Sequence, residues 1–294
     1  MKKNIKINCA IIGGSGFIGS YVAKELLQSG YRVKIIDLKI NPDFKESVVC
    51  DIKKNYLVLK KELKNIDYVF NFAGIADIEL SNNFPRKTIE ENVIGSSNVF
   101  QACVEQRIKR VFFASTLYVY SSSGGFYKAT KQALENILET YNLVYNLKFT
   151  ILRYGSVYGK GSQEWNGINK YITAAVHKKR IEYFGNGEEI REYINVVDAA
   201  KLTLETLGKE YENLYVTISG VQSIKAKDLF VMIQEILQKR IKIKYSDLKR
   251  KKEHYITTPY NYTPRRSIKI IPKQYLDLGE GLLEVVTEIK NRTY

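Results

Sequence analysis

Short runs of apolar residues alternate along this chain with longer segments in which apolar residues recur every three or four positions. The short runs predict buried strands, and the longer segments predict helices between them. The predicted strands lie at residues 7–12, 31–37, 47–52, 67–72, 110–116 and 149–153. This alternation predicts an α/β fold, a doubly wound parallel (Rossmann) sheet with helices on both faces.

The first predicted strand runs directly into a glycine-rich turn at residues 13–19. Gly13 suits a tight turn, Gly16 lets the backbone approach a pyrophosphate, and Gly19 lets the following helix pack closely. The free backbone amides in the first turn of that helix would face the anion. The residues expected to contact a dinucleotide here are Gly13, Gly16, Phe17, Ile18 and Gly19.

The helical pattern after this turn is clearest at residues 21–30. Val22, Leu26 and Leu27 have the spacing of one helix face, and Gly30 suits the helix stop. We therefore expect the three apolar side chains to face the sheet.

The second predicted strand ends in Asp37, where a ribose-binding carboxylate belongs. An isolated glycine triplet is often an ordinary turn, but strand, glycines, helix, strand and acid follow one another here in the order of a dinucleotide site. A carboxylate accepts hydrogen bonds from the two ribose hydroxyls of NAD and repels the 2′-phosphate of NADP, so the predicted cofactor is NAD. Lys39 lies close enough in the chain to weaken that discrimination.

The next two strand ends carry further candidate contacts. Asp51 and Ile52 could receive the adenine ring, or Asp51 could be the N-cap of the following helix. The small residues Ala73 and Gly74 follow Phe72 at the end of the fourth strand, where the backbone would pass close to the cofactor phosphates; these three residues are also predicted cofactor contacts.

Asn92 lies in a helix predicted from about Pro85 to Gln106. Two interpretations remain open for it: an exposed polar residue, or a tether that holds the neighbouring strand from within the fold.

The fifth strand ends in Thr116, and a helix containing Tyr127 and Lys131 follows. The latter two residues are four apart and share a helix face. An ammonium group beside a phenol favours the phenolate and brings proton transfer within reach at neutral pH. Such a pair is common by chance among 22 tyrosines, but its place after a strand that ends in a hydroxyl favours catalysis.

Composition narrows the alternatives. The chain has 294 residues, of which 45% are hydrophobic, and this is ample for a packed core. A net charge of +15 raises the possibility of nucleic-acid binding, but the lysines are dispersed and no nucleic-acid-binding motif accompanies them, so no nucleic acid is expected.

No apolar run approaches the roughly 18 residues of a membrane span, and we expect a soluble, cytoplasmic protein that does not engage a membrane. Three cysteines without paired spacing and two distant histidines predict reduced thiols and no metal site.

Several of these motifs, in this order, resemble the extended short-chain dehydrogenase/reductase family, specifically its nucleotide-sugar epimerase/dehydratase branch. The resemblance fades beyond about residue 240. The residues that carry it are Gly13 to Gly19, Asp37, Asp51-Ile52, Phe72-Ala73-Gly74, Asn92, Ser115-Thr116, Val119-Tyr120, Tyr127, Lys131, 152–159, 184–187 and 191–198.

The resemblance implies roles for residues that spacing alone does not assign. Thr116, Tyr127 and Lys131 take the hydroxyl, acid/base and lysine roles, and Lys131 would also hold the nicotinamide ribose. It also implies a nucleotide-sugar substrate, and we expect a homodimer. The implied further cofactor contacts are Asn92, Tyr127, Lys131, Tyr154 and Val157, and the implied substrate contacts are Thr116, Ser156 and Arg191.

Arg191 follows a Gly-Asn-Gly turn, and a guanidinium there is apt for a bidentate phosphate contact. The alternative for Arg191 is a surface ion pair with Glu188 or Glu192.

Departures from the family pattern bear on the reaction. Ile12 stands where the family usually has threonine, and Ser156 replaces a common asparagine. The loop at 121–126 is shorter than in most relatives and, being rich in Ser and Gly, is expected to be mobile, leaving a pocket that is either open or filled by another segment. Leu117 and Tyr118 occupy the positions where dehydratases of the family carry an Asp-Glu pair, which disfavours a 4,6-dehydratase.

The predicted organisation is a Rossmann domain at 1–155 plus about 186–210, and a smaller α/β substrate lobe at about 156–185 plus 211–294. Arg265-Arg266 could hold a diphosphate or form a surface basic pair. The function expected is an NAD-dependent nucleotide-sugar epimerase that works through a transient keto-sugar. Two alternatives remain open: an NAD(P)-dependent dehydrogenase or keto-sugar reductase, and a catalytically inactive NAD- or nucleic-acid-binding protein.

Overall fold

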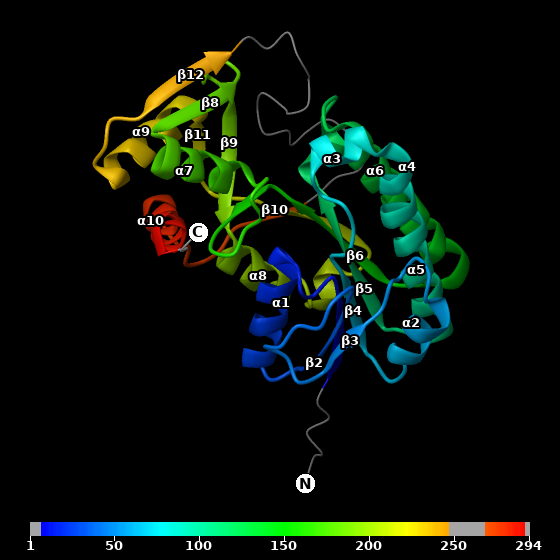
Figure 1. The fold of residues 1–294 in the computed structure, drawn as a ribbon. Coiled ribbons are helices and arrows are strands. Elements are labelled where there is room, and N and C mark those ends of the chain that lie inside the picture. Colours follow the sequence, from blue (N-terminus) through cyan, green and yellow to red (C-terminus); the bar gives the residue numbers. More distant parts are fainter. Residues whose placement is uncertain (1–6, 247–267, 292–294) are drawn as a thin grey trace.

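The computed structural model describes residues 7–246 and 268–291, and its centre is one eight-stranded sheet (Figure 1). Every neighbouring pair of strands in this sheet is parallel, which confirms the predicted doubly wound architecture. In spatial order the strands are β13 (Ile268–Ile270), β10 (Leu214–Ile218), β6 (Phe149–Tyr154), β5 (Arg110–Thr116), β4 (Tyr68–Asn71), β1 (Asn8–Ile12), β2 (Arg32–Asp37) and β3 (Ser47–Val49).

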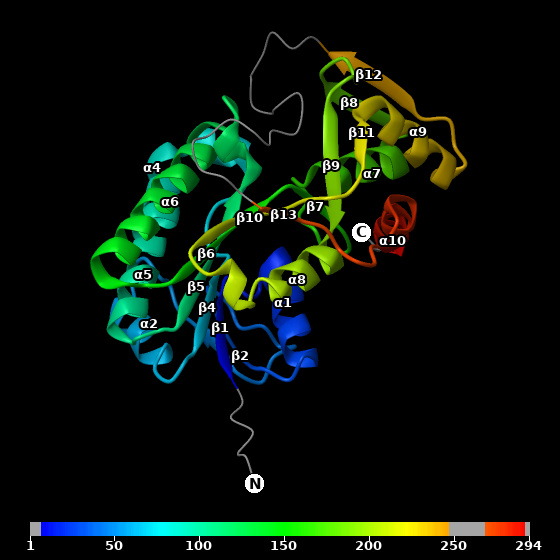
Figure 2. The ribbon, with the colours of Figure 1, turned by 180° about the vertical axis from the view of Figure 1, so that it is seen from behind.

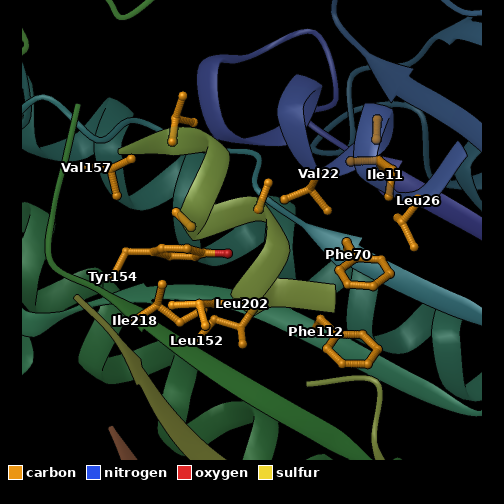
Figure 3. Close-up of a cluster of buried hydrophobic side chains, with 14 of the residues drawn as sticks. Ile11, Val22, Leu26, Phe70, Phe112, Leu152, Tyr154, Val157, Leu202 and Ile218 are labelled. Carbon is orange, nitrogen blue, oxygen red and sulfur yellow. The ribbon is translucent and has the colours of Figure 1, made fainter. Parts of the chain in front are cut away.

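Helices cover both faces of the sheet because its strands are apolar on both sides. In β1, Cys9 and Ile11 point to one core cluster, whereas Ala10 and Ile12 point to the other. The helices of the first face are α1 (Phe17–Gln28) and α8 (Val196–Glu205), and those of the second are α2 (Tyr56–Glu62), α5 (Gly95–Glu105) and α6 (Gly125–Tyr145). Figure 3 shows the first cluster, with Val22 and Leu26 close to Ile11.

The helix α1 begins at Phe17, four residues before the start of the periodic pattern at residues 21–30. It buries Gly19, Val22, Ala23 and Leu26, but Leu27 is 44% exposed. Leu27 therefore does not face the sheet, because consecutive helix residues point about 100° apart and Leu26 takes the buried position. Gly30, with φ of +87°, follows the helix as predicted.

The helix predicted from Pro85 to Gln106 is confirmed as a continuous helical stretch. It consists of α4 (Pro85–Ile89), a π-helical turn η1 (Glu90–Ile94) and α5. A short helix that the sequence pattern did not predict, α3 (Ile78–Asn83), precedes it, with Asp77 accepting a hydrogen bond from Leu80 N at 3.1 Å as its N-cap.

A smaller lobe lies beyond the carboxyl ends of the parallel strands, as the two opposite views in Figures 1 and 2 show. Its own core joins three helices to two small sheets. The elements of the lobe are β7 (Ser156–Tyr158), α7 (Gly167–Lys178), β8 (Arg180–Phe184), β9 (Ile190–Asn195), β11 (Ser223–Lys225), α9 (Ala226–Leu237), β12 (Lys242–Ser246) and α10 (Leu278–Asn291).

The expected division of the chain differs from the structure in two respects. Residues 211–294 were assigned to the smaller lobe, but β10 and β13 pair within the large sheet, where β10 lies beside β6. Residues 186–210 were assigned to the Rossmann domain, but β9 pairs with β7 and β11 in the smaller lobe. A short apolar run such as Leu214–Ile218 predicts a buried strand without indicating its neighbour. The neighbour is fixed only by tertiary pairing.

Candidate active site at the carboxyl ends of the strands

The glycine turn after β1 is packed backbone against backbone. Gly13 has φ of +78°, and a Cβ there would lie 2.7 Å from Ala73 N. A Cβ on Gly19 would lie 2.4 Å from Gly13 O, so neither position accepts a side chain without a backbone shift.

Gly16 differs from its neighbours in the turn. A Cβ on it would meet only Gly13 O, at 3.1 Å, and no other heavy atom within 4 Å. Its carbonyl accepts the first helical hydrogen bond, from Ser20 N, which leaves the amides of Phe17 and Ile18 in the unpaired first turn of α1. An anion can therefore approach the start of α1 at this point, as a dinucleotide pyrophosphate requires.

Asp37 lies at the edge of this turn. Its Oδ2 accepts a hydrogen bond from Ser15 N at 2.8 Å, and its Oδ1 accepts one from Leu38 N at 2.6 Å. The carboxylate is half-buried and held beside the phosphate-binding backbone, where the ribose of a dinucleotide belongs.

Replacing Asp37 with alanine should lower NAD affinity by about 10- to 100-fold, because a charged acceptor contributes about 1.5–3 kcal/mol to its hydrogen bonds. NADP binding should weaken less or improve, since the repulsion of the 2′-phosphate disappears. Calorimetric titration of both cofactors checks this, with Asp43→Ala, an exposed carboxylate paired with Lys24, as the control. Tighter binding of NADP than of NAD by the unmodified protein would contradict the role given to Asp37.

Asp51 does not cap the following helix. That helix starts at Tyr56 with Asn55 at the N-cap position, whereas Asp51 Oδ1 accepts a hydrogen bond from Lys53 N at 2.9 Å inside a preceding turn. The N-cap interpretation was therefore wrong, because the chain turns once more before the helix begins. Ile52 is buried against Gly95, and the adenine contacts expected of Asp51 and Ile52 remain predictions.

Asn92 is a buried tether and is only 1% exposed. Its Oδ1 accepts from Ile75 N at 2.7 Å, and its Nδ2 donates to Ile75 O at 3.0 Å and to Thr130 Oγ1 at 3.0 Å. The side chain thus fixes the loop after Phe72-Ala73-Gly74 to α6, and the exposed-residue interpretation was wrong. A Cβ on Gly74 would lie 2.6 Å from Asn92 Oδ1, so the tether also requires glycine there.

The three candidate catalytic residues lie on adjoining elements, β5 and α6. Thr116 ends β5, and its Oγ1 accepts a hydrogen bond from Tyr118 N at 3.2 Å. Tyr127 lies in the first turn of α6, with its ring 6.3 Å from that of Tyr118 in an edge-to-face arrangement. Lys131 lies one turn later on the same helix face.

Lys131 is buried at the end of β5. Its Nζ donates to Ala114 O at 2.7 Å and lies 4.8 Å from the centre of the Phe113 ring. Burial lowers the pKa of this ammonium group to about 8, against the opposing effect of Glu135. At neutral pH Lys131 is still mostly protonated, so it can stabilise a phenolate on Tyr127.

The short loop at 121–126, expected to be mobile, is packed. Ser123 and Gly124 are buried, and Gly124 and Gly125 have φ of +102° and +49°. Asn82 of α3 accepts a hydrogen bond from Phe126 N at 3.2 Å, and the Tyr118 ring lies against Gly124. These contacts hold the start of α6, and both interpretations of the pocket, open or filled by another segment, remain predictions.

Tyr154 and Val157 contribute their side chains to the core. Figure 3 shows both in the cluster beside α8, and the Tyr154 hydroxyl lies 2.6 Å from Thr203 Oγ1. The cofactor contacts expected of Tyr154 and Val157 remain predictions. Ser156 pairs in register with Tyr193 of β9, at the base of the smaller lobe.

Arg191 lies on β9 among the aromatic residues of the smaller lobe. Burial raises the pKa of Tyr171 to about 12, and the positive charge of Arg191 opposes this rise. Burial also raises the pKa of Tyr183, and Arg191 again acts to lower it. Of the two carboxylates considered as its partners, Glu188 binds Lys225 at 2.8 Å and Glu192 binds Lys269 at 2.9 Å, and the ion-pair interpretation of Arg191 stays a prediction. The phosphate contact of Arg191 remains a prediction.

The predicted diphosphate contact of Arg265-Arg266 lies outside the described residues. Within 7–246 and 268–291 no group of three or more metal-ligating side chains forms a candidate metal site. No helix in the same part of the chain is long and apolar enough to cross a bilayer.

Comparison with known proteins identifies the family. The family model described as "NAD dependent epimerase/dehydratase family" matches residues 9–215. A UDP-glucuronate 4-epimerase of Thermodesulfobacterium geofontis is 24% identical, covering 95% of this chain and 98% of that protein.

Two solved structures are similar over nearly their whole length. A UDP-N-acetylglucosamine 4-epimerase from Methanobrevibacter ruminantium, in complex with UDP-N-acetylmuramic acid, has a TM-score of 0.82 and 26% identity, covering 98% of this chain and 99% of that one. A UDP-glucose 4-epimerase from Thermotoga maritima, with UDP-glucose, has a TM-score of 0.84 at 24% identity, covering 97% of this chain and 99% of that one. The chain therefore belongs to the NAD-dependent epimerase/dehydratase family of extended short-chain dehydrogenases/reductases, and its cofactor is NAD.

Proposed function

We propose that this protein is an NAD-dependent nucleotide-sugar 4-epimerase. The observation that carries the proposal is the complete set of Thr116, Tyr127 and Lys131 at the strand ends, next to a glycine turn that fits a dinucleotide. A protein that only binds NAD has no need of this set.

Each residue of the set has a defined task at the C4 hydroxyl of the sugar. Tyr127, as the phenolate, takes the hydroxyl proton, while Lys131 stabilises the phenolate and Thr116 hydrogen-bonds the same oxygen. NAD, when bound, supplies the acceptor for the C4 hydride and returns it. Tyr127 then returns the proton to the oxygen after the keto-sugar has presented its other face, so the net change is inversion at C4.

The residues that follow Thr116 disfavour the chemistry of a 4,6-dehydratase. Leu117 is fully buried in a small cluster with Val119 and Tyr120, and Tyr118 packs beside Tyr127. Neither Leu117 nor Tyr118 carries a carboxylate that could eliminate water from the keto-sugar.

The nucleotide end of the substrate is assigned to Arg191, whose planar guanidinium suits a bidentate contact with a diphosphate. The similar 4-epimerases are named for different UDP-linked sugars, so the test of function uses a panel of nucleotide sugars.

The function is tested by incubating the purified protein, with a catalytic amount of NAD, with a panel of UDP-, GDP-, dTDP- and CDP-sugars. NMR of the sugar and absorbance of reduced cofactor are recorded together. We expect inversion at C4 for at least one sugar with no net cofactor reduction. Stoichiometric oxidation of supplied NADH by a keto-sugar, with no inversion of ordinary sugars, would instead establish a reductase.

We also propose that the protein is a cytoplasmic homodimer. Exposed apolar side chains on the outer helices, Phe84, Ile89 and Ile94, offer surface that a second copy would cover. Cys9, Cys50 and Cys103 are buried free thiols, as is usual in a reducing compartment. Light scattering coupled to size exclusion should give about twice the monomer mass of 33.9 kDa.

A further inference from the structure

A buried ion pair lies directly beneath the candidate catalytic residues. Glu135 of α6 is 2% exposed and Arg153 of β6 is 1% exposed. The guanidinium binds the carboxylate in a bidentate manner, with Nε to Oε1 at 2.9 Å and an Nη to Oε2 at 2.7 Å. The same guanidinium lies between the rings of Tyr120 and Tyr215, 4.5 and 4.3 Å from their centres.

The pair links the elements that carry the chemistry. Ser115 Oγ donates to Glu135 Oε1 at 2.6 Å, and Ser115 directly precedes Thr116 on β5. Arg153 also donates to the hydroxyl of Tyr120, at the end of the turn that follows Thr116. Glu135 itself lies one turn beyond Lys131 on α6.

Stability alone is a weak reason for this arrangement. The desolvation of two buried charges largely offsets their attraction, and apolar residues of similar volume often serve a core as well or better. A full negative charge in a low-dielectric interior, however, acts strongly on any ionisable group nearby. Lys131 is such a group.

We propose that Glu135 is a positioning residue whose carboxylate supports the ammonium form of Lys131, one helical turn before it, and that the bidentate contact with Arg153 orients Glu135 for this task. Only the expected change in the pH dependence of turnover rests on the proposed function. The effect on the charge of Lys131 is independent of the substrate.

The groups around Lys131 determine whether its pKa rises or falls when Glu135 is changed. Glu135 lies one turn beyond Lys131 on α6, while Ala114 O and the Phe113 ring contact its Nζ from β5. Arg153 of β6 is bound to Glu135, and its positive charge opposes the effect of the carboxylate. Burial lowers the pKa of Lys131 and Glu135 raises it. Removing the negative charge of Glu135 must therefore make Lys131 lose its proton at a lower pH.

The decisive variant is Glu135→Gln, which keeps the shape and an acceptor for Ser115 and Arg153 but removes the charge. The alkaline limb of the kcat profile should move to lower pH by about one unit or more, and turnover at pH 8 should fall about tenfold. Tyr120→Phe is the matched control, because it removes a contact to Arg153 without changing charge. Its alkaline limb should stay in place.

A second measurement reads the charge of Lys131 without turnover. NMR titration of protein carrying 13C-labelled lysine side chains, with the Lys131 signal assigned through Lys131→Met, should show the same downward shift in Glu135→Gln. If the titration shifts while no sugar is epimerised, the proposed function fails and the inference stands. If the titration and the alkaline limb stay unchanged and only thermal stability falls, the inference is overturned.

A paired replacement covers the case in which Glu135→Gln does not fold. Glu135→Met combined with Arg153→Met leaves no unpaired buried charge, so the core can repack. The Lys131 titration should again move to lower pH, because burial then acts without the carboxylate. An unchanged titration in this folded double variant would contradict the proposal as well.

Discussion

Replacing Tyr127 with phenylalanine is expected to lower turnover by about two to four orders of magnitude, the usual contribution of general acid/base catalysis. The phenol is the group that receives the proton, and phenylalanine keeps the ring but removes the oxygen. The edge-to-face contact with Tyr118 depends on the ring, so the start of α6 should keep its position. The measurement is kcat on the sugar that the panel identifies.

Tyr145→Phe is the matched control for this prediction. It makes the same substitution on the same helix, at a residue that is 56% exposed. Its turnover should equal that of the unmodified protein, and the fold should survive in Tyr127→Phe. If Tyr127→Phe turned over at a rate close to the unmodified protein, Tyr127 would not be the proton-transferring residue.

The parts of the site that could be predicted from sequence are those that a local pattern encodes. The glycine turn, the strand that ends at Asp37, and the spacing from Tyr127 to Lys131 each depend on residues close together in the chain. The alternation of buried apolar runs with helices likewise predicts a parallel sheet with helices on both faces, although it does not give the order of the strands.

The supporting contacts could not be predicted, because they join residues far apart in the chain. Asn92 meets Thr130 across 38 positions, and Asn82 meets Phe126 across 44. Glu135 and Arg153 are 18 apart, and neither residue differs in the sequence from an ordinary helix or strand residue. Such contacts exist only once the fold has brought α3, η1, α6 and β6 together.

The loop at 121–126 makes a contact that its composition does not reveal. Two of its glycines have positive φ in a tight entry to α6. The loop is held by α3, a helix of six residues that is too short to show a helical periodicity in the sequence. Its N-cap, Asp77, was the one local signal that could have indicated it.

Replacing Gly13 with alanine should both destabilise the protein and weaken NAD binding. The positive φ costs an L residue about 1–2 kcal/mol, and forcing a Cβ to 2.7 Å from Ala73 N adds about 1–3 kcal/mol of overpacking. The loss of unfolding free energy should thus be about 2–5 kcal/mol. Because relief of the clash moves the glycine turn away from residues 72–74, NAD affinity should also fall by about tenfold or more.

Gly30→Ala separates the two causes. Gly30 has φ of +87°, close to that of Gly13, but a Cβ there meets no heavy atom within 4 Å. This variant should lose only about 1–2 kcal/mol and should bind NAD normally. Urea unfolding and calorimetric titration of NAD are compared for both variants. Equal losses of stability at the two positions, or unchanged NAD affinity in Gly13→Ala, would show that the contact between the glycine turn and the end of β4 does not shape the cofactor site.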